Sequence, residues 1–378
     1  MEIQGRCDEK FARVRDAFAA NFANDSDLGA SFAVTVNGEY VVDIWGGHLD
    51  EAKTRPWKED TIVNVYSTTK TMAAICLLVL ADRRLVDLDA PVSKYWPEFA
   101  QNGKDGVLVK HFLSHSAGLS GMDGPVTTAD TYDWDKMTRM LAAQAPWWKP
   151  GTQSGYHAIT QGYLIGEVVR RVTNVTLGTF FRREIAEPID ADFHIGLDSR
   201  HFPRVGDLIP PPSGNAPLSP PDPESVAART FKYPPVNALD SRTPEWRRAE
   251  IPAANGHGNA RSVAKVQTLI ANGGSAFGKT ILSKQGADRA YDEQLNGMDL
   301  VLGVPVRFGM GYGLTSKDFP LGPNPHTCFW GGWGGSLVIN DADARVCIAY
   351  VMNKMGLGTT GDARASGLAM ATYQALAG

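Results

Sequence analysis

No apolar run in this sequence is long enough to cross a membrane. The longest, residues 72–81, has about half the length that a membrane-spanning helix needs. The first residues also lack the basic segment and the following apolar stretch of a secretion signal. From these two absences we expect a cytoplasmic protein without a membrane partner.

A large net charge is missing as well. The 378 residues contain 37 Lys and Arg against 41 Asp and Glu, which gives a formal net charge of −4. A protein that binds nucleic acid needs a basic surface, so we expect no nucleic-acid partner. The composition is otherwise that of a globular protein, and the length suits two lobes of ordinary domain size.

Cysteine is scarce: the chain has four, and none forms a Cys-x-x-Cys pair. The sequence therefore gives no support for a zinc site or a dithiol redox motif. The pattern puts Cys328 and Cys347 on strands that could be adjacent. In the reducing compartment expected here, we interpret both as small buried hydrophobic residues and not as a disulfide.

Strand signals are absent from the middle of the chain and occur near its two ends. Residues 32–36 and 39–45 flank Asn37-Gly38, which is the strongest short signal of a β-hairpin. Three further β-like segments lie towards the C-terminus, over residues 307–315, 328–339 and 345–352.

The remaining periodic segments are helical. A stripe of Phe11, Val14, Phe18 and Phe22 predicts a first, amphipathic helix. Residues 67–84 predict a helix that is apolar on most faces and therefore buried. Further helices are expected over residues 136–143, 160–173, 262–271 and 363–376.

Residues 202–235 are rich in Pro, Ser, Asp and Gly. A segment so dense in proline is expected to form neither a regular helix nor a central strand. It is either an ordinary surface loop or a loop that walls the substrate pocket, where long loops are often found.

Together these patterns predict an α+β protein of two lobes. Residues 1–75 and 250–378 would form one lobe, an antiparallel sheet built from both ends of the chain and flanked by the terminal helices. Residues 76–249 would form a mainly helical lobe that carries the Pro-rich pocket loop 202–235. A cleft between two lobes is a common place for an active site.

The segment Ser67-Thr-Thr-Lys70 begins the buried helix. Ser67 would lie at the helix N-terminus, where unpaired N–H groups and the dipole favour a developing oxyanion. Lys70 follows one turn later on the same face, where burial would lower its pKa. Ser262 and Lys265 repeat the spacing, but there we expect Ser262 to be a helix N-cap. Burying Ser67 and Lys70 beside an apolar helix without purpose would be costly.

Four segments together resemble the motifs of the class C β-lactamase and penicillin-binding-protein superfamily. Ser67-Thr-Thr-Lys70 matches the first motif, and residues 109–119 resemble the stretch that follows it. Residues 150–158, with Tyr156, occupy the place of a Tyr-x-Asn motif, and residues 329–336 that of a Lys-Thr-Gly strand. Within the superfamily the chain most resembles the family VIII carboxylesterases. The Gly-x-Ser-x-Gly elbow of α/β-hydrolases is absent.

The resemblance implies a role for each motif. Ser67 would be the acylated nucleophile, Lys70 its activator and Tyr156 a general base, and which of the two bases acts first stays open. The backbone N–H groups of Ser67 and Trp333 would form the oxyanion hole. No cofactor is implied, because all these groups belong to the protein. The substrate-binding residues would be Trp330, Gly331, Gly332 and His157.

Some of these residues have a purely structural alternative. Gly331 and Gly332 could serve only close packing instead of substrate approach. His111 and His115 are four residues apart, as zinc ligands on a helix can be, but no third ligand is evident and we interpret both as structural. The tryptophans near the motifs could be pocket walls or core residues; they are Trp147, Trp148, Trp330 and Trp333.

Two departures from the β-lactamase pattern indicate the substrate. Trp330 replaces the lysine that faces a substrate carboxylate, which removes a contact worth about 1.5–3 kcal/mol. Ala158 replaces the asparagine that contacts the substrate amide. We therefore expect a serine carboxylesterase that hydrolyses short-chain, apolar esters through a Ser67 acyl-enzyme. The alternatives are a β-lactamase or lactam amide hydrolase, an acyltransferase, and a non-catalytic penicillin-recognising protein. The sequence leaves the oligomeric state open.

Overall fold

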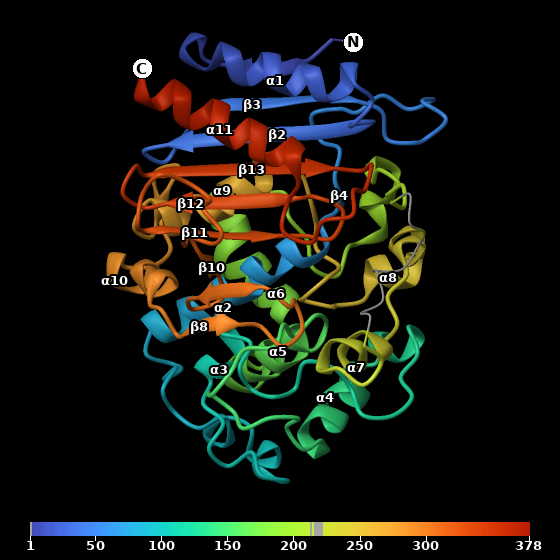
Figure 1. The fold of residues 1–378 in the computed structure, drawn as a ribbon, viewed down its shortest axis with the longest axis vertical. Coiled ribbons are helices and arrows are strands. Elements are labelled where there is room, and N and C mark those ends of the chain that lie inside the picture. The colour runs from blue at the N-terminus through green and yellow to red at the C-terminus, as the bar shows by residue number, and fades with distance from the viewer. Residues whose placement is uncertain (1, 212–213, 215–221) are drawn as a thin grey trace.

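The computed structural model describes residues 2–211, 214 and 222–378. Strands from both ends of the chain form one nine-stranded sheet in which each pair of neighbours is antiparallel (Figure 1). Its spatial order is β1 (Gln4–Cys7), β3 (Glu39–Gly47), β2 (Gly29–Val36), β13 (Val346–Met352), β12 (Leu337–Asp341), β11 (Thr327–Gly331), β10 (Gly313–Leu314), β9 (Pro305–Phe308) and β8 (Leu295–Met298). Two small ribbons pair β4 (Val63–Asn64) with β5 (His257–Gly258) and β6 (Ser275–Ala276) with β7 (Lys279–Thr280). The predicted sheet from both termini is confirmed.

The hairpin signal at Asn37-Gly38 is confirmed by backbone geometry. Both residues have positive φ, 54° and 91°, as a two-residue turn between antiparallel strands requires. β2 then pairs with β13 along its length, so that Phe32 lies opposite Tyr350. This pairing joins the N-terminal hairpin to the C-terminal strands.

Helices cover both faces of the sheet. α1 (Ala12–Ala23) and α11 (Ala363–Ala377) pack side by side over one face, and α9 (Ala260–Ala271) packs on β2, β12 and β13 from the other (Figure 1). The other helices lie beside or below the lower strands of the sheet in Figure 1: α2 (Thr69–Asp82), α3 (Lys110–Leu113), α4 (Trp134–Ala143), α5 (Thr160–Thr173), α6 (Leu177–Phe181), α7 (Val226–Lys232), α8 (Pro244–Arg248) and α10 (Lys284–Asp288). Within the part of the chain that the structure describes, no helix is both long and apolar enough to span a membrane.

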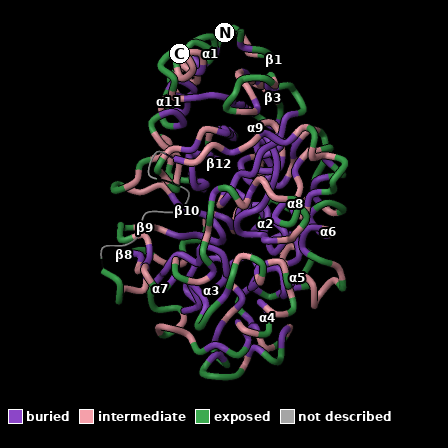
Figure 2. Tube along the Cα trace, turned by 90° about the vertical axis from the view of Figure 1, so that its right-hand side faces the viewer, coloured by how far each residue is buried: buried purple, intermediate pink, exposed green. Residues whose placement is uncertain are grey.

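Buried residues continue from the sheet into the helices around its lower strands (Figure 2), and their apolar side chains belong to one large cluster. α2 lies at its centre, and its side chains from Thr69 to Leu80 are all buried. The predicted lobe boundary at residue 75 falls inside this helix. The division into two lobes therefore stays a prediction.

The strand predictions near the C-terminus were too coarse. Residues 307–315 form the end of β9 and all of β10, with a turn between them, and residues 328–339 hold parts of β11 and β12. The turn that separates β11 from β12 depends on glycine, because Gly334 and Gly335 have φ of 100° and 121°.

Cys328 and Cys347 are not on adjacent strands: β12 lies between them, and both pair with Asn340. Both are free and buried.

Two helix predictions also need correction. Ser262 is not the N-cap of α9; Asn259 caps the helix, and Ser262 is its reciprocal partner in a capping box. The Pro-rich segment contains α7, because the stretch from Val226 to Lys232 has no proline and follows a Ser225 cap. Residues 212–213 and 215–221 of that segment lie outside the described residues.

A buried ion pair fixes α11 to the rest of the fold. The Arg364 guanidinium donates from Nη1 to Asp27 Oδ1 at 2.9 Å, and Asp27 is fully buried. The other guanidinium nitrogen, Nη2, donates to the carbonyl of Gly334 at 2.8 Å. Arg364 therefore connects the start of α11 to the turn between β11 and β12.

Removing this guanidinium should destabilise the protein strongly. Arg364→Met leaves the Asp27 carboxylate buried without a cationic partner and bonded only to the Tyr350 hydroxyl, and we expect the free energy of unfolding to fall by about 3–5 kcal/mol. Denaturant unfolding measures this, with the exposed Arg13→Met as a control that should change it by less than about 0.5 kcal/mol. A loss below about 1 kcal/mol for Arg364→Met would show that the pair does not anchor α11.

Candidate active site

A strained turn presents Ser67. The residue lies in a single 3-10 turn, Tyr66–Thr68, between β4 and α2, not at the first residue of the α-helix as the sequence predicted. Tyr66 has φ of 43°, a rare conformation for a tyrosine. Its ring packs against Trp333 at 5.1 Å between centroids, and its hydroxyl donates to the Ala238 carbonyl. These contacts hold the turn in place.

The Lys70 amine lies in a buried pocket of oxygen atoms. Its Nζ is 3.0 Å from Ser67 Oγ, 2.7 Å from the Ala158 carbonyl and 2.9 Å from the Ala253 carbonyl. The side chain is only 1% exposed. Burial lowers the pKa of Lys70 well below its usual range, and no carboxylate in the described residues offsets this effect.

Tyr156, on the segment before α5, reaches the same serine. Its hydroxyl forms a hydrogen bond with Ser67 Oγ, and its ring lies 4.7 Å from Lys70 Nζ. Burial raises the pKa of the Tyr156 phenol above its usual value, which favours the protonated form. Asp299 accepts a hydrogen bond from the Tyr156 backbone N–H at 3.1 Å. The structure thus brings together the three side chains that the motifs singled out.

The turn between β11 and β12 lies against the turn that contains Ser67. Ser336 Oγ donates to the Val65 carbonyl and contacts Thr68 Oγ1 at 2.9 Å, which ties this turn to the turn that carries Ser67. The N–H groups of Gly332 and Gly334 are both bonded to carbonyls. The N–H of Trp333, between them, has no backbone acceptor in the described part of the chain. It is therefore available for an oxyanion.

Gly331 and Gly332 serve backbone packing. A Cβ on Gly332 would lie 2.1 Å from the Val65 carbonyl oxygen, and one on Gly331 would lie 2.5 Å from Thr360 Cα. Neither glycine lines the cavities described below. Their role in substrate approach stays a prediction, whereas the packing alternative has direct support.

The prediction that His157 binds substrate gains no support from the structure, because His157 is not among the residues that line either cavity described below. His157 is fully buried, its Nδ1 contacts the Gly155 carbonyl, and its Nε2 accepts from the Leu119 N–H. Burial lowers its pKa to about 3. His115 is equally buried and accepts from the His157 backbone N–H, and His111 accepts from the Leu108 N–H. The two predicted structural histidines are thus bonded to backbone groups.

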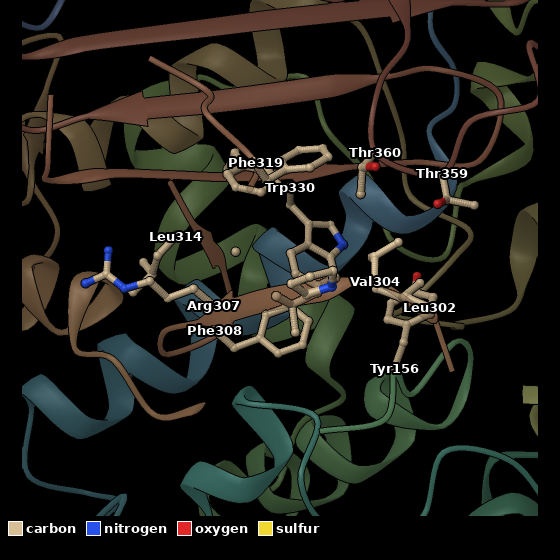
Figure 3. A pocket seen from close by; sticks show the side chains of 14 residues that line it. Tyr156, Leu302, Val304, Arg307, Phe308, Leu314, Phe319, Trp330, Thr359 and Thr360 are labelled. Atoms are coloured by element: carbon tan, nitrogen blue, oxygen red, sulfur yellow. The ribbon is translucent and has the colours of Figure 1, made fainter. Parts of the chain in front are cut away.

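Two cavities meet at Tyr156, Leu302 and Thr359. The smaller, of about 60 Å³, contains Ser67 and is completed by Tyr66, Ala158, Ile159, Phe231, Val236, Ala254 and Trp333. Phe231 comes from α7, so the Pro-rich segment does contribute to a cavity wall. The larger, of about 220 Å³, is shown in Figure 3 and includes Trp330. The Trp330 indole nitrogen is buried without an acceptor among the described residues.

Sequence reasoning missed three supporting groups. The Ala253 carbonyl carries no signal, because any residue type supplies one. Asp299 has no motif around it, although its Oδ1 accepts from three backbone N–H groups: those of Tyr156, Val301 and Leu302. Ser336 lies inside a motif, but only its side-chain contacts with Val65 and Thr68 show that it ties the β11–β12 turn to the turn that contains Ser67.

Known proteins resemble this chain over nearly its whole length. A family model described as Beta-lactamase matches residues 18–371. Esterase/beta-lactamase LipL of Mycobacterium tuberculosis is 37% identical over 365 residues, which cover 93% of this chain and 83% of LipL. A crystal structure of a family VIII carboxylesterase has a TM-score of 0.94 at 43% identity, covering 99% of this chain and 100% of that one. A penicillin-binding protein homologue from Caulobacter crescentus has a TM-score of 0.92 at 40% identity, with the same coverage.

The resting Tyr156 should be a phenol and not a phenolate. Since burial raises its pKa, we expect the near-ultraviolet difference spectrum between wild type and Tyr156→Phe to lack a tyrosinate band from about pH 7 to 9. The same titration in denaturant is the control, because its tyrosines ionise near about pH 10. A tyrosinate band below about pH 9 that disappears in Tyr156→Phe would contradict this assignment.

Proposed function

The chain belongs to the beta-lactamase family, and from this premise we propose that it is a serine carboxylesterase with Ser67 as the acylated nucleophile. The family resemblance and the fold class expected from the motifs are thereby confirmed. Similarity to a family VIII carboxylesterase and to an esterase/beta-lactamase supports ester hydrolysis. The cytoplasmic location expected from the sequence stays a prediction.

The observation that carries the proposal is the double contact of Ser67 Oγ. One oxygen atom contacts both the Lys70 amine and the Tyr156 hydroxyl, and it faces a cavity that Trp333 also lines. A nucleophile needs a nearby base, a nearby acid and a binding site for the oxyanion. This arrangement has a candidate for each.

We propose Lys70 as the first proton acceptor. Burial lowers the pKa of its amine and raises that of the Tyr156 phenol, so the resting pair would be a neutral amine and a protonated phenol. A neutral amine donates two hydrogen bonds, which suit the carbonyls of Ala158 and Ala253. Its lone pair would then face the hydroxyl of Ser67, 3.0 Å away.

Acylation follows from these positions. Ser67 Oγ bonds to the ester carbonyl carbon while its proton passes to Lys70 Nζ. The N–H groups of Ser67 and Trp333 would stabilise the charge on the carbonyl oxygen. When the tetrahedral intermediate collapses, the alcohol oxygen leaves with the phenolic proton of Tyr156, and the Lys70 ammonium replaces that proton.

Deacylation uses the same groups in the reverse direction. Water occupies the place of the departed alcohol and attacks the acyl carbon. Its proton passes to Tyr156 while the phenol gives its own proton to Lys70. Lys70 then returns a proton to Ser67 Oγ, and the free acid leaves. Every proton taken up in a turnover is released within it, so no cofactor is needed.

The charges around the site favour a neutral ester over a β-lactam. Trp330 stands where the family pattern has a lysine. Arg307 is the one charged residue lining the larger cavity in the described structure, and it is paired with Glu293. A substrate carboxylate would therefore find no free cation there. β-Lactam hydrolysis is the second candidate, because LipL is named as both an esterase and a beta-lactamase.

Three substitutions test the assigned roles. We expect Ser67→Ala, Lys70→Ala and Tyr156→Phe each to lower kcat/KM for p-nitrophenyl butyrate at least about a thousandfold. Ser262→Ala, at the serine of the second Ser-x-x-Lys segment, is the matched control and should retain the wild-type rate, because the Ser262 side chain is bonded only to Asn259 at the start of α9. Near-wild-type turnover by Ser67→Ala would refute the proposal.

The preference for esters is measured separately. We expect kcat/KM for p-nitrophenyl butyrate to exceed that for a chromogenic cephalosporin at least about tenfold, the equivalent of the missing charged contact. Initial rates of both substrates on one preparation give the ratio, with Ser67→Ala as the blank. Equal or faster cephalosporin turnover would make the protein a β-lactamase first.

A further inference from the structure

The larger of the two cavities has no role in the mechanism described so far. It lies beside the catalytic tyrosine and is lined mainly by apolar side chains (Figure 3). Its walls come from the edge of the sheet, with Val306 and Phe308 on β9, Leu314 on β10 and Trp330 on β11. An apolar cavity beside a nucleophile is expected to bind part of the substrate.

The position of Tyr156 indicates which part this is. An ester has two arms, and the bond between them breaks at the alcohol oxygen. The acyl arm must stay with Ser67, which lines the smaller cavity. The alcohol oxygen must reach the acid that protonates it, and Tyr156 lines both cavities. The alcohol arm therefore extends past Tyr156 into the larger cavity.

The sizes of the two cavities differ in a way that limits each arm. An apolar cavity of about 150 Å³ can hold a benzene molecule. The larger cavity, at about 220 Å³, exceeds that volume, whereas the smaller, at about 60 Å³, is well below it. The larger cavity can hold an aromatic ring, whereas the smaller is too small to enclose one and suits a short acyl chain.

The walls of the larger cavity also define its chemistry. Phe319 and Phe329 stack at 5.1 Å with a 20° angle between their planes, and Trp330 stacks on His115. Arg307, the one charged residue in the described lining, is held by Glu293 and donates to the Thr315 carbonyl at 3.1 Å. An uncharged, ring-containing group fits such walls better than a charged one.

We infer that this cavity is the alcohol subsite, and that the preferred substrates are short-chain acyl esters of bulky, ring-containing, uncharged alcohols. The inference rests on the proposed function, since it assigns the two arms of the ester that Ser67 cleaves. It adds which cavity binds the alcohol arm and which binds the acyl arm, and which residues determine the specificity for each arm.

The first test varies one arm of the ester at a time. Propyl acetate and 2-phenylethyl acetate differ in the size of the alcohol but little in its acidity, so their intrinsic reactivity is similar. We expect kcat/KM for 2-phenylethyl acetate to be at least about tenfold higher, because the ring buries apolar surface. Ethyl octanoate should be at least about tenfold poorer than ethyl acetate, because its chain exceeds the smaller cavity.

The second test fills one cavity at a time with a matched pair of variants. Val306 lines only the larger cavity and Val236 only the smaller, and both are half-buried. We expect Val306→Trp to abolish the preference for 2-phenylethyl over propyl acetate. Val236→Trp should keep that preference and lower the rate of ethyl butyrate relative to ethyl acetate. Met298→Trp, an exposed site on β8 outside both cavities, should change neither ratio.

Each variant is compared by the ratio of two rates from one preparation, so partial loss of folded protein does not alter the result. Faster hydrolysis of long acyl chains with no dependence on alcohol size would overturn the inference, because the larger cavity would then hold the acyl arm. An intact alcohol preference in Val306→Trp would overturn it as well. Failure to hydrolyse any ester would overturn the proposed function itself, and the inference with it.

Discussion

The site depends on the burial of one amine. Lys70 is held under Ser67 by two backbone carbonyls, those of Ala158 and Ala253, which lie far apart in the sequence. Both carbonyls must meet at the first turn of α2, so the segments around them have to pack on that helix. The apolar side chains of α2 keep water away and lower the pKa of the amine. A lysine that remained exposed would be charged at neutral pH and could not accept a proton.

The closure of the chain onto itself completes the site. The first hairpin pairs with the last strand, β13. Because β12 and β11 follow β13 in the sheet, they lie close to the turn that contains Ser67. Their connecting turn is held from both sides, by Ser336 at Val65 and by Arg364 at Gly334. The Trp333 N–H is therefore fixed before any substrate arrives, which is the condition for effective oxyanion stabilisation. The edge strands beyond β11 continue into the wall of the larger cavity.

Much of this could be predicted from local sequence patterns. The Asn37-Gly38 turn, the apolar helix after Ser67 and the terminal helices all have signals within a few residues. The Ser67, Lys70 and Tyr156 cluster came from motif spacing. The contributions of Ala253 and Asp299 could not be found in this way, because they depend on tertiary contacts. The burial of His157 could not be predicted either, because its neighbour Tyr156 lines the cavities while its own ring is buried in the core.

The central claim is that the reaction passes through an acyl group on Ser67. Its most direct test is rapid acid quenching of the enzyme during turnover of an acetate ester, followed by mass spectrometry of the intact protein and its peptides. The account predicts an added acetyl group on the peptide that contains Ser67, absent from Ser67→Ala and gone once the substrate is exhausted. Steady turnover with no adduct in any quenched sample, or with the acetyl group on another residue, would contradict it.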